Sequence, residues 1–201
     1  MPRSLTDLDW PVRTERLLIR PATTDDAERT WAYRRLNEVS QWLSGGDPGR
    51  EEYIARFTEP GYLASALILE REDAAGTVLI GDLKLAVEDG WAQREVAERA
   101  VGVQAELGWV LDPAHRGRGY AVEAVTALLG ISFDRMGLRR IVAYCFADNE
   151  ASWRLMERIG LRREMHTVAD SLHRSGAWLD GLGYALLADE WRARTDRRPS
   201  A

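Results

Sequence analysis

The stretch that most constrains the fold is residues 107–121, where an apolar segment ends at Asp112-Pro113 and a loop of arginines and glycines follows. An amphipathic helix is expected to begin near Gly119. This order of strand, loop and helix forms anion sites, because helix-terminal N–H groups and glycine backbone come close to a bound anion. The spacing lacks the Gly-Lys-Ser/Thr of a P-loop, and Val122 stands where a dinucleotide fingerprint needs glycine. We therefore predict a diphosphate held by arginines and backbone amides.

The composition indicates one domain with a sizeable core, because 45% of the 201 residues are hydrophobic. The net charge of -5 argues against nucleic acid as a partner and suits a cationic amine. Cys145 is the single cysteine and the three histidines lack ligand spacing, so we expect no disulfide within the chain and no metal. We find no signal-peptide core and no apolar run of membrane-spanning length. The expected location is the cytoplasm, with no membrane partner.

Alternating and helical periodicities interleave along the chain, which predicts an α/β fold with a mixed sheet. Strands are expected over residues 13–21, 63–70, 77–87, 103–111, 141–146, 161–171 and 177–187. Helices are expected over residues 24–36, 50–57, 119–136 and 149–159. The segment 88–101 fits either a short helix or an ordered excursion. We predict a domain over residues 1–194 and a flexible tail over residues 195–201.

The arginine–glycine loop resembles the acetyl-CoA-binding motif of the GNAT acetyltransferases, Gln/Arg-x-x-Gly-x-Gly/Ala, here met by Arg116, Gly119 and Ala121. Other segments are similar to the RimJ/RimL branch of that superfamily, which contains the ribosomal-protein N-terminal acetyltransferases. They are the opening strand at 14–21, the Asp-Asn-Glu-Ala-Ser segment with its following helix at 148–160, and the closing strand at 176–191. The resemblance covers nearly the whole chain in order, except that residues 88–101 look like an insertion.

The resemblance implies a single-domain GNAT fold, in which a splayed, mixed and largely antiparallel sheet is flanked by helices. It also implies that the pantetheine arm of acetyl-CoA enters the split of the sheet and pairs with main chain near Val110 and Leu111. Asn149 is expected to hydrogen-bond that arm, and Ser152 to lie beside the thioester sulfur. The residues expected to seat the diphosphate are Arg116, Gly117, Arg118, Gly119, Tyr120 and Ala121.

Two residues are candidate catalysts. Glu106 is a carboxylate on a mostly apolar strand and is expected to deprotonate the incoming ammonium, directly or through water; the alternative is an exposed position or a partner for a nearby arginine. Ser152 is expected to be the acid or the hydrogen-bond donor for the leaving sulfur, and the alternative is a helix first turn capped by Asn149. Many GNAT enzymes place a tyrosine acid one turn further along, where this chain has Met156.

The predicted activity is acetyl-CoA-dependent N-acetylation of a primary amine by direct attack in a ternary complex. The acceptor stays open between a protein N-terminal α-amine and a small molecule, and so does a homodimer. Trp31 and Trp42 are candidate walls of the acceptor cleft, and Cys145 is interpreted as a small buried hydrophobe that forms no acetyl-enzyme. The alternatives are a non-catalytic acyl-CoA-binding or sensing domain and, less favoured, a nucleotide-phosphate module.

Overall fold

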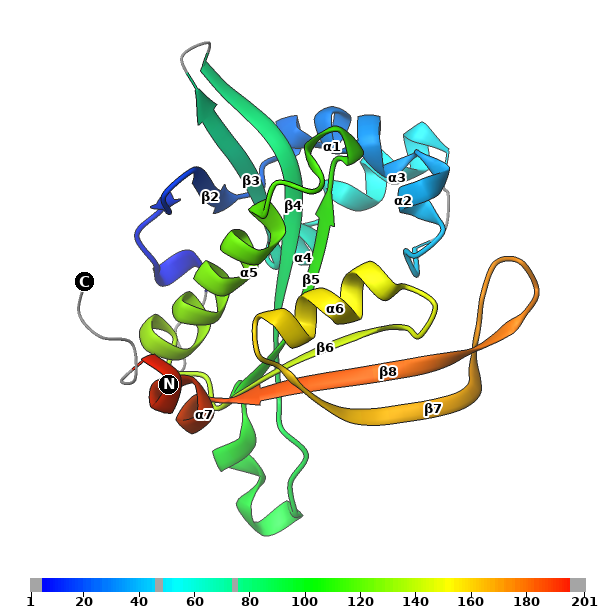
Figure 1. Ribbon diagram of the computed structural model, residues 1–201. Helices are drawn as coiled ribbons and strands as arrows, with labels where there is room; N and C mark the ends of the chain where they lie inside the picture. The colour runs from blue at the N-terminus through cyan, green and yellow to red at the C-terminus, as the bar shows by residue number, and fades with distance from the viewer. Residues whose placement is uncertain (1–4, 46–48, 74–75, 196–201) are drawn as a thin grey trace.

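The computed structural model describes residues 5–45, 49–73 and 76–195. They contain an open eight-stranded sheet in the order β1-β2-β3-β4-β5-β6-β8-β7 (Figure 1). Every neighbouring pair is antiparallel except β5 and β6, so the predicted mixed, largely antiparallel sheet is confirmed. The strands are β1 (Val12–Arg13), β2 (Leu17–Pro21), β3 (Ala66–Asp73), β4 (Gly76–Glu88), β5 (Gln104–Leu111), β6 (Arg140–Phe146), β7 (Arg162–Leu172) and β8 (Trp178–Leu187).

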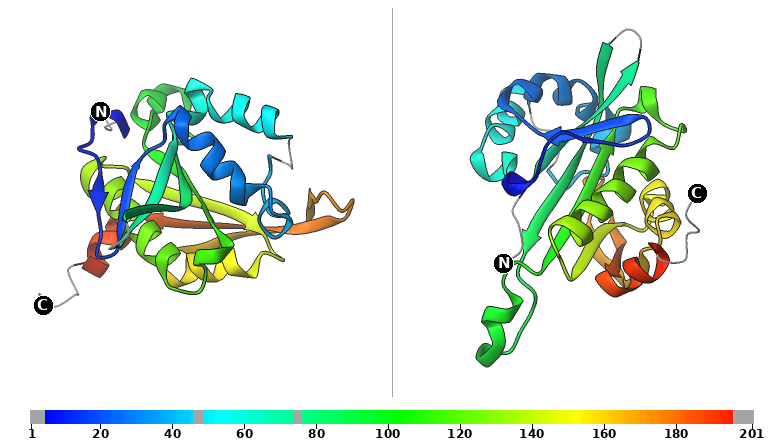
Figure 2. Two further views of the ribbon diagram at one scale, coloured as in Figure 1. Left: turned by 90° about the horizontal axis from the view of Figure 1, so that it is seen from above. Right: turned by 90° about the vertical axis from the view of Figure 1, so that its left-hand side faces the viewer.

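Helices cover both faces of the sheet (Figure 2). On one face lie α1 (Ala27–Arg34), α2 (Asn37–Ser40), α3 (Arg50–Phe57) and α4 (Pro60–Leu63). On the other lie α5 (Tyr120–Gly130), which continues into the π-helical turn η5 (Ile131–Arg135), α6 (Glu150–Arg158) and α7 (Ala188–Thr195). Short 3-10 segments are η1 (Leu5–Asp7), η2 (Thr24–Asp26), η3 (Arg94–Ala100) and η4 (Pro113–His115). No helix among the described residues is long and apolar enough for a membrane span.

The two faces of the sheet pack into separate hydrophobic cores. Leu107 on β5 belongs to the larger core, which includes buried side chains of α5 and α6. Val110 on the same strand belongs to the smaller core, which includes side chains of α1 and α3. Side chains of a strand alternate between faces, so β5 contributes to both cores. The face of β5 that carries Glu106, Gly108 and Val110 is therefore the face that α1–α4 cover.

The sheet splits between β5 and β6. Their parallel pairing is limited to three residue pairs, the last of which joins Glu106 and Val142. Beyond this point β5 stays paired with β4 as far as Leu111, whereas β6 stays paired with β8 as far as Phe146. The two strands therefore diverge in the part that leads to the arginine–glycine loop, as the resemblance implied.

Two segments, at the start and at the end of the sheet, differ from the sequence-based expectation. The predicted first strand is divided into β1 and β2 by a turn in which Thr14 N–H donates to the Leu17 carbonyl at 2.9 Å. The strand expected over residues 177–187 is β8, whereas Glu190 and Trp191, which the resemblance placed with the closing strand, lie in α7. There the Glu190 carboxylate accepts from the Leu187 N–H at 2.9 Å. This contact caps the first turn of the helix. The predicted tail beyond Thr195 lies outside the described residues.

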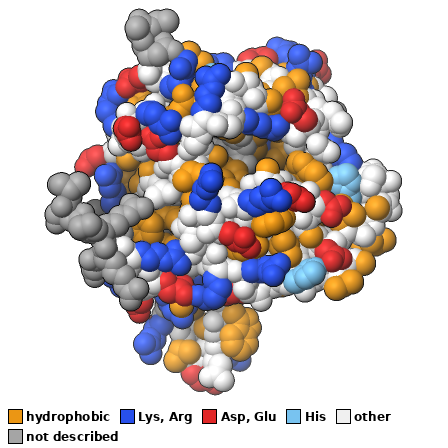
Figure 3. Space-filling model, viewed as in Figure 1, with side chains coloured by type: hydrophobic (Ala, Val, Ile, Leu, Met, Phe, Trp, Pro, Cys, Tyr) orange, Lys and Arg blue, Asp and Glu red, His pale blue; other side chains and the backbone are white. Residues whose placement is uncertain are grey.

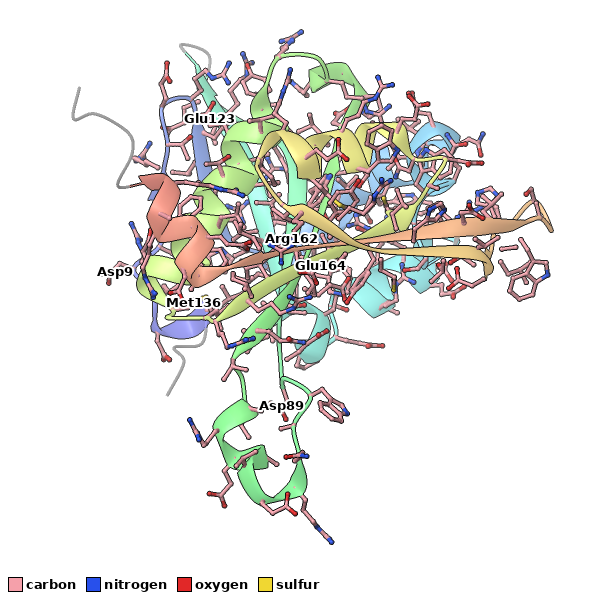
Figure 4. All side chains as sticks on the ribbon, turned by 60° about the horizontal axis from the view of Figure 1, so that its bottom comes forward. Asp9, Asp89, Glu123, Met136, Arg162 and Glu164 are labelled. Carbon is pink, nitrogen blue, oxygen red and sulfur yellow. The ribbon has the colours of Figure 1, made fainter. Side chains whose placement is uncertain are left out.

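Residues 88–101 form the ordered excursion that was one of the two alternatives. It projects from the sheet between β4 and β5 and contains η3 (Figure 1). Its base is closed by a hydrogen bond from Gly90 N–H to the Ala100 carbonyl at 2.7 Å and by one from Gly102 N–H to Asp89 at 2.8 Å (Figure 4). Trp91 in this excursion is 93% exposed.

Candidate active site

The loop after β5 ends in a helix N-terminus that no side chain caps. The N-cap residue of α5 is Gly119, in the left-handed conformation with φ of 80°, and the first α-helical bond runs from Glu123 N–H to its carbonyl. The amides before Glu123 in the first turn have no acceptor within the helix. Gly117 is also left-handed, with φ of 73°. Both positions require glycine, and the uncapped amides fit a bound anion such as a diphosphate.

Arg16, which sequence reasoning did not select, holds this loop in place. Its Nη1 donates to the Arg118 carbonyl at 3.0 Å, its Nη2 lies 2.6 Å from the Glu123 carboxylate, and its guanidinium stacks 4.8 Å from the centroid of the Tyr120 ring. Burial opposes ionisation of Glu123, but hydrogen bonds from Thr14 and Arg16 hold the pKa of that carboxyl below its usual value. Arg16 thus joins the start of β2 to the start of α5 beside the candidate anion site.

The predicted diphosphate residues occupy different surroundings. Arg116 forms an ion pair of 2.8 Å with Glu38, which connects the loop to α2 on the other side of the sheet. Arg118 is exposed, so its guanidinium is accessible to a ligand. The Tyr120 side chain is buried in the larger core and Ala121 packs against it, so both contribute backbone rather than side chain to the anion site. Apolar surface lies at the middle of this face, with basic and acidic side chains around it (Figure 3).

The main chain of β5 presents a free edge to the split. Asp112 N–H donates to the Ile80 carbonyl at 2.9 Å, which fixes the alternation of the β4–β5 ladder. By that alternation the backbone groups of Val110 point toward β4, and those of Trp109 and Leu111 point into the split. Trp109 was missed because the periodicity of side chains does not show which way the peptide groups face.

Asn149 and Ser152 lie at the start of α6, opposite that edge. Asn149 is the N-cap, and its side-chain oxygen accepts from Ser152 N–H at 3.3 Å, so the capping role is part of its function. Burial raises the pKa of the Cys145 thiol, and a side-chain hydrogen bond from Ser152 acts in the opposite direction. The Ser152 hydroxyl is therefore next to β6 at the split. Met156 carries no ionisable group and is fully buried in the larger core, so this position supplies no general acid.

Glu106 lies at the base of the split, on the opposite face of the sheet from Ser152. It is the last residue of β5 that pairs with β6, and its side chain is 30% exposed. Its carboxylate forms an ion pair of 2.9 Å with Lys84 on the neighbouring strand β4. The expected alternative of a basic partner is thus also realised, with a lysine in place of an arginine.

Three rings from distant segments form a cluster near the end of β6. Trp42, Phe146 and His173 have ring centroids 5.4–6.3 Å apart. His173 Nε2 donates to the Gln41 carbonyl at 2.9 Å, which attaches the β7–β8 turn to the segment after α2. Trp31 is not part of this cluster and packs on Tyr53, with the two ring centroids 5.3 Å apart. Of the two tryptophans selected from the sequence, the structure brings only Trp42 to the strand end beside the split.

Tyr144 is a further residue that the sequence reasoning missed. It lies on β6 beyond the last pair with β5, on the face shared with Val142, and is 54% exposed. Its exposure is a property of the tertiary structure that the residues of this strand do not signal. No group of three or more potential metal-ligating side chains occurs within the described part of the chain.

Comparisons with known proteins agree with this geometry. Residues 16–162 match the family described as acetyltransferase (GNAT) domain. The uncharacterized N-acetyltransferase YnaD of Bacillus subtilis is 29% identical over 184 residues, covering 90% of this chain and 98% of that protein. A GNAT-family acetyltransferase structure from Bacillus anthracis has a TM-score of 0.74 at 29% identity, covering 90% of this chain and 100% of that one. RimL, a ribosomal L7/L12 α-N-protein acetyltransferase solved with coenzyme A, shares the fold with a TM-score of 0.67 at 19% identity, covering 88% and 97%.

Proposed function

Because the chain belongs to the GNAT acetyltransferase family, we propose that it transfers the acetyl group of acetyl-CoA to a primary amine by direct attack in a ternary complex. The observation that supports this most is the position of the sheet split. It begins at Glu106 and leads along β5 to the uncapped N-terminus of α5. The part of β5 beyond Glu106, residues 107–111, is roughly 16 Å long at the rise of a β-strand, and η4 and the arginine–glycine loop connect its end to α5. An extended arm that carries a diphosphate at one end and a thioester at the other fits this arrangement.

The donor is held mainly by backbone. The first-turn amides of α5, with the exposed guanidinium of Arg118, seat the diphosphate. Trp109 and Leu111 offer their split-facing peptide groups to the pantetheine arm, in place of the expected pair of Val110 and Leu111. The side-chain amide of Asn149 keeps its nitrogen as a donor while its oxygen caps α6. Acetyl-CoA itself supplies the activated acetyl thioester.

The two candidate catalysts act from opposite faces of the sheet. Glu106, on the face of α1–α4, accepts the proton of the incoming ammonium directly or through one water, which leaves the amine nitrogen free to attack the carbonyl carbon. Ser152, on the face of α6, donates a hydrogen bond to the leaving sulfur. A thiol pKa near 8.5 means that the thiolate needs only modest help, so a fully buried Met156 in place of a tyrosine is compatible with turnover.

The acceptor is a primary amine of a protein N-terminus or of a small molecule. RimL is a ribosomal L7/L12 α-N-protein acetyltransferase, which favours including peptides that begin with a free α-amine in any substrate search. An α-amine, with a pKa near 8, is easier to deprotonate than a lysine near 10.4. A panel of N-terminal peptides and small amines, followed by thiol release and by mass spectrometry of the products, identifies the class.

The test of Glu106 is its pH–rate profile. Glu106→Gln should lower kcat most at low pH, where the amine is protonated and needs a base, and should do so about 10²- to 10⁴-fold. Glu88→Gln is the matched control, because Glu88 is a carboxylate on β4 that lies on the same face of the sheet as Glu106. Its pH–rate profile should be like that of the wild type. A Glu106→Gln profile that overlays the wild type rejects the base. Binding of CoA without turnover of any amine rejects the transferase proposal in favour of a sensing domain.

A further inference from the structure

The ammonium group of Lys84 lies on the carboxylate that is proposed to receive the acceptor's proton. Lys84 Nζ is 2.9 Å from Glu106 Oε2, and the two side chains are 46% and 30% exposed. Lys84 is the register partner of Gly108 on β5, one alternation step from Glu106 on the same face. A side-chain carbon added at Gly108 would lie 3.4 Å from Lys84 Cβ and 3.8 Å from its Cδ. The lysine stem therefore runs across the bare backbone of Gly108 toward the base of the split.

This position has a consequence for any amine that approaches Glu106. The amine nitrogen must come within hydrogen-bond reach of the carboxylate, directly or through one water. It then shares that carboxylate with the ammonium group of Lys84. A like charge nearby disfavours the charged form of an ionisable group, so the ammonium form of the acceptor is penalised and its neutral form is not. Acyl transfer requires the neutral form.

We propose that Lys84 is a positioning residue that keeps the bound acceptor amine in its neutral, nucleophilic form. The inference rests on the proposed function, because it acts through Glu106. Lys84 forms no bond with substrate and gives up no proton. It holds the Glu106 carboxylate in one place through the ion pair and opposes a second positive charge there.

The other charged and titratable groups on this side of the sheet do not replace Lys84. Asp82 on β4 is hydrogen-bonded to Tyr33 and ion-paired with Arg34 of α1, and Arg140 on β6 is ion-paired with Glu164. Glu88 on β4, Tyr144 on β6 and Tyr62 on α4 also lie on this side of the sheet. None of these is a cation. Among the described residues, Lys84 is the one basic side chain ion-paired with Glu106.

The test compares Lys84→Met, which keeps the apolar stem and removes the charge, with Lys84→Arg, which keeps the charge. The acidic limb of kcat reports ionisation in the enzyme–substrate complex. In Lys84→Met this limb should move to higher pH by roughly 0.5 to 2 units. The lower and upper values are the interaction of two unit charges about 6 Å apart, first in the dielectric of bulk water and then in that of a protein surface. The KM for a cationic amine should fall because the repulsion is gone. Lys84→Arg should keep the wild-type limb.

The outcomes separate this inference from the proposed function. A partly exposed ion pair contributes little to folding, so Lys84→Met should stay folded, with CoA affinity as a check. A merely structural role for Lys84 lowers the rate equally at all pH values and leaves the limb in place, which overturns the inference. So does a limb shift in Lys84→Arg equal to that in Lys84→Met. If Glu106→Gln overlays the wild type or no amine is turned over, the proposed function fails, and the role of Lys84 fails with it.

Discussion

The requirement for glycine at the start of α5 gives a quantitative prediction. Gly119 has φ of 80°, and a left-handed conformation costs a residue with a side chain about 1–2 kcal/mol. Where the first turn keeps this conformation, Gly119→Ala should lower the free energy of unfolding by that amount, or the melting temperature by about 2–4 °C per kcal/mol for a domain of this size. The added carbon would lie 3.4 Å from Arg16 Nη2, which is ordinary contact, so the cost comes from the backbone conformation and falls as the first turn rotates.

The same strain energy sets the effect on the donor. Where the first turn of the free variant rotates and relieves this strain, binding of CoA to the amides in their present orientation must restore it. The losses of unfolding free energy and of binding free energy therefore sum to about 1–2 kcal/mol, and full relief weakens the affinity by roughly 5- to 30-fold. Gly137→Ala is the matched control, because Gly137 has φ of 72° and a carbon added there meets nothing within 4 Å. Isothermal titration calorimetry with CoA and thermal unfolding should show weaker CoA binding only in Gly119→Ala, and a smaller loss of stability there than in Gly137→Ala. Unchanged CoA affinity together with that smaller loss of stability would refute the anion site.

Two further predictions concern ionisable groups. Asp26 is buried, which raises the pKa of its carboxyl, but hydrogen bonds from Arg20 and Thr23 outweigh burial and lower it. Its contribution to stability is therefore present above the unfolded pKa near 3.9 and lost as pH falls through the lower folded value. Asp26→Asn should cost about 1–3 kcal/mol at pH 7 with a smaller gap to wild type at pH 3 in urea unfolding, and an equal gap at both pH values would contradict this. Ser152→Ala should raise the pKa of the buried Cys145 thiol further, because the hydrogen bond that lowers it is lost, and so slow alkylation by iodoacetamide at pH 8.5 about two- to tenfold. An unchanged alkylation rate would show that the hydroxyl does not reach the sulfur.

The sequence was sufficient for the framework and for a prediction of the donor. Turn signals and periodicity located the main strands and helices to within a few residues, because a half-buried strand and an amphipathic helix each impose a local repeat. Gly117 and Gly119 indicated the anion site for the same local reason, since a backbone with positive φ needs glycine wherever the rest of the chain lies. The division of residues 13–21 into two strands was missed because a short turn leaves little pattern.

The acceptor side depended on contacts that no local pattern encodes. Arg16 reaches the Arg118 carbonyl and His173 reaches the Gln41 carbonyl across more than 100 residues of chain. The pairing of Lys84 with Glu106 depends on the register of β4 against β5, which is fixed by the whole ladder.

The arginine–glycine loop, as sequence, predicted an anion site at the start of a helix and, with the resemblance, that the anion belongs to acetyl-CoA. Only the tertiary structure decided that Trp109 and Leu111, rather than Val110, turn their peptide groups into the split. It also decided that a lysine stands beside the candidate base. The physical reason is that side-chain periodicity reports which face of a strand is buried, whereas the direction of peptide groups and the partners of charges follow from which strands lie next to each other.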